Sequence, residues 1–346
     1  MTRKATSQDV ADRAGVSRSA VSFVLNGRAD GNIAKEKQER ILAAARELNY
    51  TPNAVARSLQ SQRTHTIGVV TDSIAGGPFA GKLLQGASNA AYRAGYLLLV
   101  IDTQSEDVRE DSAFTTLVNR QVDALVFAAM SLREHVPHPA MAGLPAVLAN
   151  SFDPAGNIRS IIPDEVAGGR SAARVLLDAG HRDIAYLSGT GELVATARRT
   201  QGFNEALSAA GLPAPAAIPT GWEINDGYAA ALLLLSDDGR PAGIVCANDR
   251  VAVGAMLACG TLGLRVPEDV SLVGYDDDEP LARTTVPGLT TIALPHREMG
   301  EAAMEFLLAD LGRSGAARSA APKGGPAQVL LPCPMVMRGS VAAPTR

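Results

Sequence analysis

The sequence contains few of the residues that build disulfide frameworks or metal centres. Only 3 of its 346 residues are cysteine and 5 are histidine. The cysteines are odd in number and widely spaced, without a Cys-x-x-Cys pair, which argues against a disulfide framework and a zinc site of that kind. Cys246 lies in an apolar segment and Cys259 in an alanine-rich one, as buried inert thiols do. The carboxylates at 276–279 lack the spacing of an EF-hand loop, so we expect no bound metal and no cofactor.

Long hydrophobic runs are also absent. The longest apolar segments are well short of the roughly 20 residues that a membrane-spanning helix needs. No secretory signal pattern opens the chain. We therefore expect a cytoplasmic protein without a membrane partner.

Complete enzyme motifs are missing as well. Residues 76–82 have the spacing of a phosphate loop, but Leu83 replaces the Ser or Thr that holds Mg²⁺, and Pro78 removes a needed amide. The glycines at 189 and 191 lack the third glycine of a dinucleotide fingerprint. His181, between a helical and a strand pattern, is better explained by a structural role. Because no Ser/His/Asp or Cys/His set is present, we predict no catalytic residues and no enzymatic activity.

Charge is distributed unevenly along the chain. The overall formal net charge is −4, but residues 1–65 carry a net +5 and the remainder a net −9. A basic end on an acidic body steers that end towards phosphate groups. The distribution is typical of a protein that brings its N-terminal part to nucleic acid.

The N-terminal part begins with two short helical patterns that meet at Gly15, which can supply the positive φ of a sharp turn. Ser17 is placed to cap the second helix. Val16 and Val21 are placed to pack against each other at its start, as in a hydrophobic staple. The inward face of that helix is Ala20, Val21, Val24 and Leu25, and the outward face is Arg18, Ser19, Ser22 and Phe23. A short packed helix with outward polar residues fits a reader of the DNA major groove. The alternative is an ordinary helical hairpin whose outward side chains are only solvated.

A third helix and a marginal segment follow. Apolar residues at helical spacing predict an amphipathic helix over residues 34–49, which Pro52 ends. Residues 53–60 have helical composition but form only two turns, so alone in water they should be marginal or unfolded. On forming a helix, Val55 and Leu59 would share an apolar stripe with no core of its own to cover it.

From residue 66 onward the pattern changes to alternating strands and helices. Apolar strands are predicted at 66–71, 96–101, 124–127 and 146–148, and a second set, beginning near 161, at 184–187, 242–246 and 270–274. Helical patterns separate them at about 78–94, 106–120, 165–179, 197–210, 226–236 and 250–262. Such patterns predict parallel sheets covered on both faces. Two sets predict two doubly wound α/β subdomains, with a ligand cleft where the carboxyl ends of their strands face each other.

These motifs resemble the LacI/GalR family of bacterial transcription regulators. The resemblance is carried by residues 9–11, 14–17, 24–26 and 52–59, and in the body by residues 180–185, 247–249 and 269–277. It implies an all-α helix-turn-helix headpiece in residues 1–61, with a hinge helix at 53–60. It also implies a periplasmic-binding-protein-like α/β core for effector binding and dimerisation in residues 62–346. By that analogy the N-subdomain spans about 64–161 and 293–321, and the C-subdomain about 162–292 and 322–340.

The resemblance also implies which residues contact DNA. In the family pattern the second helix reads bases, and the hinge helix, folded only when two subunits meet on DNA, inserts Leu59 into the minor groove. The alternative is a linker leucine buried against the core. The implied DNA-binding residues are Thr6, Ser7, Ser17, Arg18, Ser19, Ser22, Phe23, Asn26, Asn53, Val55, Ala56 and Leu59.

A second set of residues matches the family's effector pocket. It comprises Asp72, Pro78, Phe79, Asn150, Arg199, Trp222, Asn248, Asp276 and His296. Carboxylate, guanidinium, amide and aromatic groups together suit a saccharide. Taken singly, Asp276 and Asn248 also fit turn-formers, and Arg199 a cation on a helix surface. His296 stands where relatives often have an aromatic residue, which leaves the identity of the effector open.

The sequence therefore predicts a ligand-responsive transcriptional regulator associated with the nucleoid. The favoured mechanism is a repressor that leaves a palindromic operator when a sugar-like effector binds. Its rivals are a corepressor-activated regulator of the same architecture and a sugar-binding transport component. We expect a homodimer, because the hinge segment needs a partner and no leucine heptad near the end of the sequence supports a tetramer.

Overall fold

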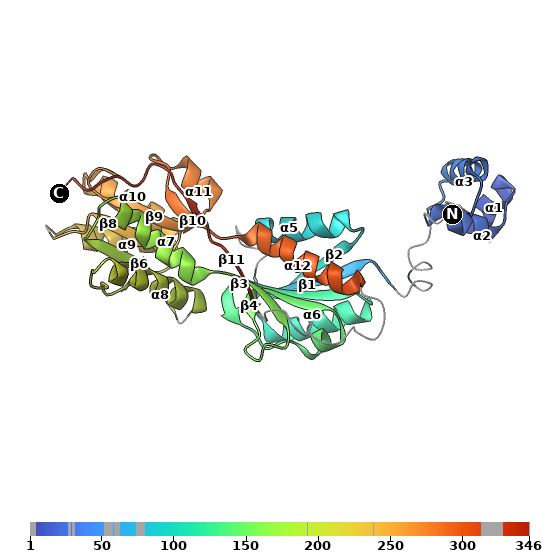
Figure 1. Cartoon of the computed structure of the whole chain (residues 1–346), viewed down its shortest axis with the longest axis horizontal. Helices are drawn as coiled ribbons and strands as arrows, with labels where there is room; N and C mark the ends of the chain where they lie inside the picture. The colour runs from blue at the N-terminus through green and yellow to red at the C-terminus, as the bar shows by residue number, and fades with distance from the viewer. Residues whose placement is uncertain are drawn as a thin grey trace. The chain divides into compact units, whose positions relative to one another are not determined.

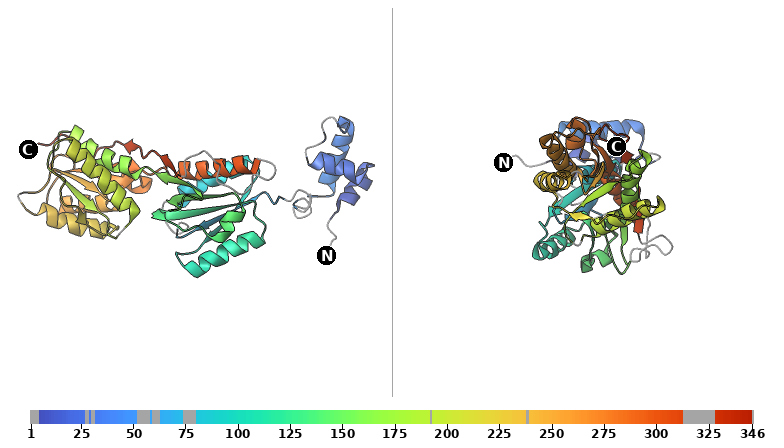
Figure 2. Two further views of the ribbon diagram at one scale, coloured as in Figure 1. Left: turned by 60° about the horizontal axis from the view of Figure 1, so that its bottom comes forward. Right: turned by 90° about the vertical axis from the view of Figure 1, so that its left-hand side faces the viewer.

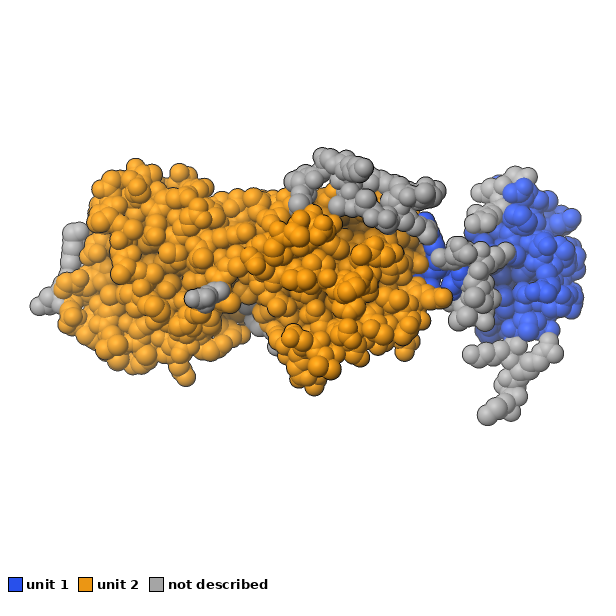
Figure 3. Space-filling model, turned by 90° about the horizontal axis from the view of Figure 1, so that it is seen from below, with its two compact units in different colours: residues 1–64 blue, residues 65–346 orange. Residues whose placement is uncertain are grey.

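The computed structural model describes residues 5–26, 29, 32–51, 58, 63–73, 80–191, 193–237, 239–312 and 328–345. They belong to two compact units, Met1–Thr64 and His65–Arg346, which are coloured separately in Figure 3. The sequence places the headpiece boundary close by, after residue 61.

The described residues of the first unit form a bundle of three helices, α1 (Ser7–Ala14), α2 (Arg18–Leu25) and α3 (Lys35–Glu47) (Figure 1). Its core is small and apolar, with Val10, Val21 and Ile41 at most 1 % exposed. The third helix is slightly shorter than residues 34–49, because Ala34 and Leu48 are its cap residues. An ion pair between Arg13 and Glu47, 2.9 Å long, also joins α1 to α3.

The second unit contains two six-stranded sheets, each with helices on both faces (Figures 1 and 2). The first sheet has the order β11-β5-β4-β3-β1-β2 and all its strands are parallel. Its strands are β1 (Thr66–Thr71), β2 (Leu97–Asp102), β3 (Ala124–Glu134), β4 (Ala146–Phe152), β5 (Arg159–Pro163) and β11 (Gln328–Leu331). A 3-10 turn, η2 (Pro139–Gly143), precedes β4.

The second sheet has the order β12-β10-β9-β8-β6-β7, and only β12 runs antiparallel to its neighbour. Its strands are β6 (Ile184–Ser188), β7 (Ile218–Pro219), β8 (Gly243–Cys246), β9 (Ser271–Asp276), β10 (Thr290–Ala293) and β12 (Met335–Val336). The chain passes between the sheets after β5, β10 and β11, so three crossovers join the two halves.

Side-chain alternation along the strands explains the helical layers. On the first sheet, Val69 and Val126 point towards α5 (Ala80–Arg93) and α12 (His296–Gly312), and Val70 and Phe127 towards α6 (Asp107–Asn119). On the second, one face packs on α7 (Glu165–Asp178) and α8 (Val194–Ala209). The other packs on α9 (Ile224–Leu235) and α10 (Asp249–Thr261), and a short helix, α11 (Glu279–Thr284), follows β9. These layers confirm the predicted doubly wound α/β architecture.

The structure corrects the predicted place of the strand at 328–331. The sequence assigns it to the C-subdomain, but β11 pairs with β5 of the first sheet, with Val329 opposite Ile161. An apolar run identifies a strand without identifying its neighbour, which tertiary contacts determine. The strand β3 is also longer than 124–127, because after an irregularity it pairs again with β4 through Arg133 opposite Ser151.

The three cysteines are buried and free. Burial raises the pKa of the Cys259 thiol to about 11 and that of the Cys246 thiol further still. Within the described ranges, no three His, Cys, Asp or Glu side chains are grouped to hold a metal ion. Among the helices of those ranges, none combines the length and apolar character needed to cross a bilayer.

Candidate functional site

The turn between α1 and α2 has the geometry that the sequence predicts. Gly15 has φ of 64° at the C-terminal end of α1, where its N–H donates to carbonyls of that helix. Ser17 caps α2, since its hydroxyl accepts from the backbone N–H of Ala20. Thr6 and Asp9 form a reciprocal capping box at the start of α1.

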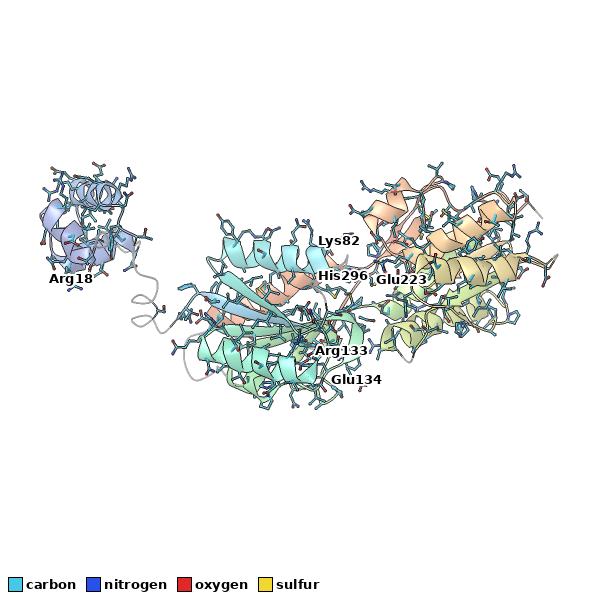
Figure 4. The ribbon with its side chains drawn as sticks, turned by 180° about the vertical axis from the view of Figure 1, so that it is seen from behind. Arg18, Lys82, Arg133, Glu134, Glu223 and His296 are labelled. Carbon is cyan, nitrogen blue, oxygen red and sulfur yellow. The ribbon has the colours of Figure 1, made fainter. Side chains whose placement is uncertain are left out.

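The outward face of α2 does not pack against the other helices of the bundle. Arg18, Ser19, Ser22 and Phe23 are all exposed, Phe23 at 42 %. Figure 4 labels Arg18 at the surface of this unit. The four side chains therefore form one exposed face of α2 that combines an arginine, two hydroxyls and an aromatic ring. Asn26, at the end of the helix, is exposed and donates to Ser22 Oγ.

Six predicted site residues lie outside the described residues. They are Asn53, Val55, Ala56 and Leu59 of the predicted hinge, and Pro78 and Phe79 of the predicted effector pocket.

A buried cluster of polar side chains in the second unit surrounds Arg199 on α8. Its Nε and Nη2 donate to both carboxylate oxygens of Glu165, at 2.8 and 2.9 Å, and its Nη1 donates to the carbonyl of Ala247. The side chains of Arg199 and Glu165 are only 8 % and 2 % exposed. Burial opposes the charge of Arg199, but the Glu165 carboxylate outweighs it and raises the pKa of the guanidinium. The alternative that Arg199 is a surface cation is therefore wrong.

Tyr275 completes this cluster from β9. Its hydroxyl donates to Glu165 Oε2 at 2.8 Å, and its ring lies under the Arg199 guanidinium, 3.7 Å from ring centroid to Cζ. Gly168 makes this contact possible, because a Cβ there would lie 1.9 Å from the Tyr275 hydroxyl. A Cβ on Gly169 would likewise lie 2.1 Å from the carbonyl oxygen of Arg199. The two adjacent glycines thus let α7 approach both α8 and β9.

Asp276 ends β9 beside this cluster. Its carboxylate is 3.6 Å from Arg199 Nη2 and its side chain is 9 % exposed. Burial raises the pKa of Asp276 to about 7, with Arg199 opposing the shift and Glu165 adding to it. Asp276 and Asp277 have φ of 101° and 51°, an unfavourable conformation for residues with a Cβ. Strain of this kind at the end of a strand is often found where a side chain must face a ligand.

Hydrogen bonds from neighbouring elements hold the turn after Asp276. Asp249 at the start of α10 is buried, and its carboxylate accepts from the Thr291 hydroxyl at 2.6 Å and the Asp278 N–H at 2.7 Å. Asp277 pairs with Arg338 at 2.7 Å. Burial and the nearby Asp276 raise the pKa of Asp249 well above its usual value.

Asn248 and Trp222 lie close together at the same edge of the second sheet. Asn248 caps α10 through its Oδ1, and its Nδ2 donates to the backbone carbonyl of Trp222. Asn248 therefore has a structural role at the start of α10, a helix cap rather than the turn-former that the sequence left open. The Trp222 ring lies over Gly189, where a Cβ would be 2.1 Å from ring carbon Cζ2.

On the first sheet, Asp72 and Asn150 lie towards the carboxyl edge, as Asn248 and Trp222 do on the second sheet. Asp72, after β1, accepts from the N–H groups of Ser73 and Met130 and lies 3.4 Å from Arg133 Nε. Asn150 has φ of 51°, and its Nδ2 donates to the carbonyls of Ala129 and Met130. Both side chains are buried.

The carboxyl edges of the two sheets approach each other within this unit. Lys82 on α5 donates to the backbone carbonyl of Asp277 at 3.0 Å, and Leu132 and Phe152 pack with Ala195 of α8. His296, at the start of α12, is buried, and burial lowers its pKa to about 4, so it is neutral at pH 7. In Figure 4, Lys82, His296, Arg133 and Glu223 are labelled where the two halves meet.

Sequence reasoning missed four members of this site, Glu165, Tyr275, Lys82 and Arg133. The adjacent glycines at 168 and 169, inside a helical pattern, were a usable signal, because helix-interior glycines often mark a close approach. Nothing in the sequence paired Glu165 with Arg199, 34 residues away.

Comparison with known proteins agrees with both units. Residues 6–53 match the family model for bacterial regulatory proteins of the lacI family, and residues 173–341 a periplasmic binding protein-like domain. The ribose operon repressor of Haemophilus influenzae is 35 % identical over 306 residues, covering 88 % of this chain and 91 % of the relative. The chain belongs to the LacI family.

Further similarities extend over most of the chain. The HTH-type transcriptional repressor PurR of Vibrio vulnificus is 36 % identical over 309 residues, covering 88 % of this chain and 91 % of the relative. A structure of the lac repressor dimer bound to operator and an anti-inducer matches with a TM-score of 0.81 and 29 % identity, covering 99 % of this chain and 100 % of that one. This LacI-family chain is therefore a DNA-binding transcriptional regulator and not an enzyme.

Proposed function

We propose that this LacI-family regulator is a repressor that binds a palindromic operator as a homodimer and releases it when a small sugar-like effector binds. It acts in the cytoplasm, on the nucleoid. The observation that carries the proposal is a set of side chains at two sheet edges that meet in one unit, of which Asp72, Asn150 and Asp276 are buried and Trp222 is half-buried. Asp72 and Asn150 come from the first sheet, and Asp276 and Trp222 from the second.

A ligand that touches both sets binds one arrangement of the two sheets better than others, and this difference in affinity is the source of the switch. The relatives named as ribose operon repressors make ribose the first ligand to test. The proposed pocket comprises Asp72, Pro78, Phe79, Asn150, Trp222, Asn248, Asp276 and His296, with Arg199 beneath Asp276.

The test combines a binding signal with an operator signal. Trp222 is the only tryptophan, so a sugar stacking on it should change the fluorescence of the protein. DNA selected from a random pool would supply the operator, and fluorescence anisotropy would follow its release by ribose and other mono- and disaccharides. Enhanced operator binding would instead identify a corepressor-activated regulator, and no response to any ligand would contradict the proposal.

The proposed operator contacts predict a specific effect for Arg18. Arg18→Ala should relax the base preference at one half-site position by about 1–3 kcal/mol, as expected for a base contact in the major groove. Leu59→Ala, which removes the proposed minor-groove wedge, should weaken operator binding far more than binding to random DNA. Anisotropy on single-base operator variants measures the effect of Arg18→Ala, and anisotropy on operator and on random DNA measures that of Leu59→Ala. An equal loss on all sequences would make Arg18 a phosphate contact.

Exposed apolar side chains support the homodimer. Leu233 on α9 is 79 % exposed and Leu257 on the adjacent α10 is 54 % exposed, and on the first sheet Leu97 of the edge strand β2 is 62 % exposed. Packing against a second copy would remove their apolar surface from water, so we propose them as interface residues. We expect light scattering at micromolar concentration to give a dimer and the Leu233→Glu, Leu257→Glu double variant to give monomers. Val286→Glu, at a 96 % exposed loop position, is the control. A tetramer, or a dimer that survives the double substitution, would contradict this interface.

A further inference from the structure

The turn that follows β9 has a strained backbone that other elements hold in place. Asp276 and Asp277 both have positive φ, 101° and 51°, and such a backbone persists only where its surroundings fix it. Arg338, after β12, donates to the Asp277 carboxylate at 2.7 Å. Asp249 of α10 accepts from the N–H of Asp278 at 2.7 Å. Both of these supports belong to the half of the unit that is built on the second sheet.

A further support comes from the half that is built on the first sheet. Lys82 lies on α5, which packs on that sheet, and its Nζ donates to the backbone carbonyl of Asp277 at 3.0 Å. The same ammonium group lies 3.7 Å from a carboxylate oxygen of Glu279, at the start of α11. Figure 4 labels Lys82 where the two halves meet. The contact therefore joins α5 to the residue directly after Asp276, the proposed effector acceptor.

Asp277 is thus bound from both halves at once. Its carboxylate pairs with Arg338, and its carbonyl accepts from Lys82. The side chains of Asp277 and Arg338 are only 13 % and 14 % exposed, whereas that of Lys82 is 35 % exposed. A charged contact that solvent reaches contributes little free energy, so a relative movement of the halves would break the Lys82 contact before the Arg338 pair.

Apolar contacts join the halves at a different place. Leu132 and Phe152 of the first half pack with Ala195 of α8, and each of the three is at most 8 % exposed. Arg198, also on α8, lies over the Phe152 ring, 5.1 Å from ring centroid to Cζ. Ile162 of the same cluster lies in β5, after which the chain crosses to the second sheet. Buried apolar contacts beside a crossover suit a pivot, whereas a half-exposed cation that reaches across suits a latch.

We propose that Lys82 is a positioning residue of the switch, which holds the two halves in the described arrangement and couples that arrangement to Asp276 through the carbonyl of Asp277. Movement of α5 away from the turn breaks the hydrogen bond and lets the strained backbone relax, which redirects the Asp276 carboxylate. By reciprocity, an effector that fixes Asp276 changes the stability of the Lys82 contact. The signal thereby reaches the half whose first strand, β1, follows the DNA-binding unit in the chain. This inference rests on the effector site proposed above.

The experiment compares Lys82→Met with a matched control in the full chain. Methionine removes the ammonium group and keeps an unbranched apolar side chain. Arg170→Met is the control, because Arg170 is also 35 % exposed and pairs with a carboxylate, that of Glu205. Arg170 and Glu205 lie on α7 and α8, which both belong to the second half. A merely structural effect of a lost surface ion pair should therefore be alike in the two variants.

Distances between spin labels report the arrangement of the halves without any ligand. Ser112→Cys on α6 and Ser208→Cys on α8 place labels at exposed positions of the first and second half. The three native cysteines are buried, so a thiol-reactive label attaches to the introduced ones. An excess of unlabelled protein makes distances within one chain dominate. We expect one main distance in the wild type and in Arg170→Met, and a broader or second population in Lys82→Met.

Coupling to operator is measured with D-ribose as the probe. The quantity is the factor by which saturating ribose changes the operator Kd in fluorescence anisotropy. It should fall about tenfold in Lys82→Met, since allosteric coupling is typically 5- to 150-fold, and should stay unchanged in Arg170→Met.

The two readouts together decide the inference. An altered distance distribution with reduced coupling in Lys82→Met alone supports it. Unchanged distances overturn it, and if coupling is lost without them Lys82 is a ligand contact instead. Unchanged coupling overturns it as well, because Lys82 then transmits nothing to operator. If neither ribose nor any other mono- or disaccharide changes operator binding, the proposed function fails, whereas the distances still decide whether Lys82 holds the two halves.

Discussion

Asp276→Ala should abolish the response to effector and leave operator affinity in the absence of effector nearly unchanged. The substitution removes a buried acceptor for ligand hydroxyls, and each hydrogen bond lost in this way costs about 1–3 kcal/mol. The operator contacts proposed above belong to the first unit, whereas Asp276 belongs to the second. The expected phenotype is a repressor that stays on its operator at every effector concentration.

Anisotropy of labelled operator measures both the response to effector and the operator affinity without it. The effector used is the mono- or disaccharide that releases the wild-type protein from operator. Thr261→Ala, on the exposed end of α10, serves as the control. A variant that still binds effector normally, or that loses operator without effector, would show that Asp276 is not part of the pocket.

The pKa of Asp276 adds a pH dependence to this prediction. Because the ionised carboxylate is the acceptor and its pKa is about 7, effector affinity should rise as pH increases from 6 to 8. The sign for stability is opposite: because burial raises the folded-state pKa of Asp276 from 3.8 to about 7, the fold loses stability as pH rises from about 4 to about 7, and the loss levels off above that pH. Asp276→Asn should therefore lose the pH dependence of binding without lowering thermal stability. A flat pH profile in the wild type would contradict the role of the carboxylate.

The sequence predicted local features well. The cap at Ser17, the turn at Gly15 and the inward face of α2 depend on residues a few positions apart, and all are present in the structure. The two parallel sheets followed from apolar strand runs separated by helical patterns. Their edges also follow from parallel topology, which explains why Asp72, Asp276 and Asn248 end or follow strands as expected. Asn150, expected to follow a strand at 146–148, lies inside β4, which extends to Phe152.

What the sequence did not predict depends on contacts between distant segments. The strand β11 was assigned to the wrong sheet, because its apolar pattern fits either edge. The sequence also did not show that Glu165 and Ala247 accept three of the N–H donors of Arg199. The sequence shows which hydrogen-bonding groups a side chain has. Only the folded structure shows whether other protein groups already accept from its donors.

Arg199→Ala should be among the most destabilising single substitutions in the second unit. It would leave the Glu165 carboxylate buried at 2 % exposure, without its bidentate partner and with only the Tyr275 hydroxyl among its described donors. Breaking one partner of a buried pair in this way costs about 3–5 kcal/mol, because the remaining charge is uncompensated. Urea unfolding of the full chain, followed by circular dichroism, measures the loss. Arg170→Ala breaks the half-exposed pair with Glu205 between the same two helices and should cost far less.

The double variant Glu165→Leu, Arg199→Met decides whether the loss comes from the unpaired charge or from lost packing. Removing both charges together leaves no buried ion, so much of the stability should return, as often happens when apolar residues replace a buried pair. The same variant should bind effector poorly, because Asp276 would lose the neighbouring guanidinium 3.6 Å away that lowers its pKa. Stability regained with effector response still absent would show that the pair serves the pocket rather than the fold. A double variant as unstable as Arg199→Ala would instead place the contribution of Arg199 in its stacking on Tyr275.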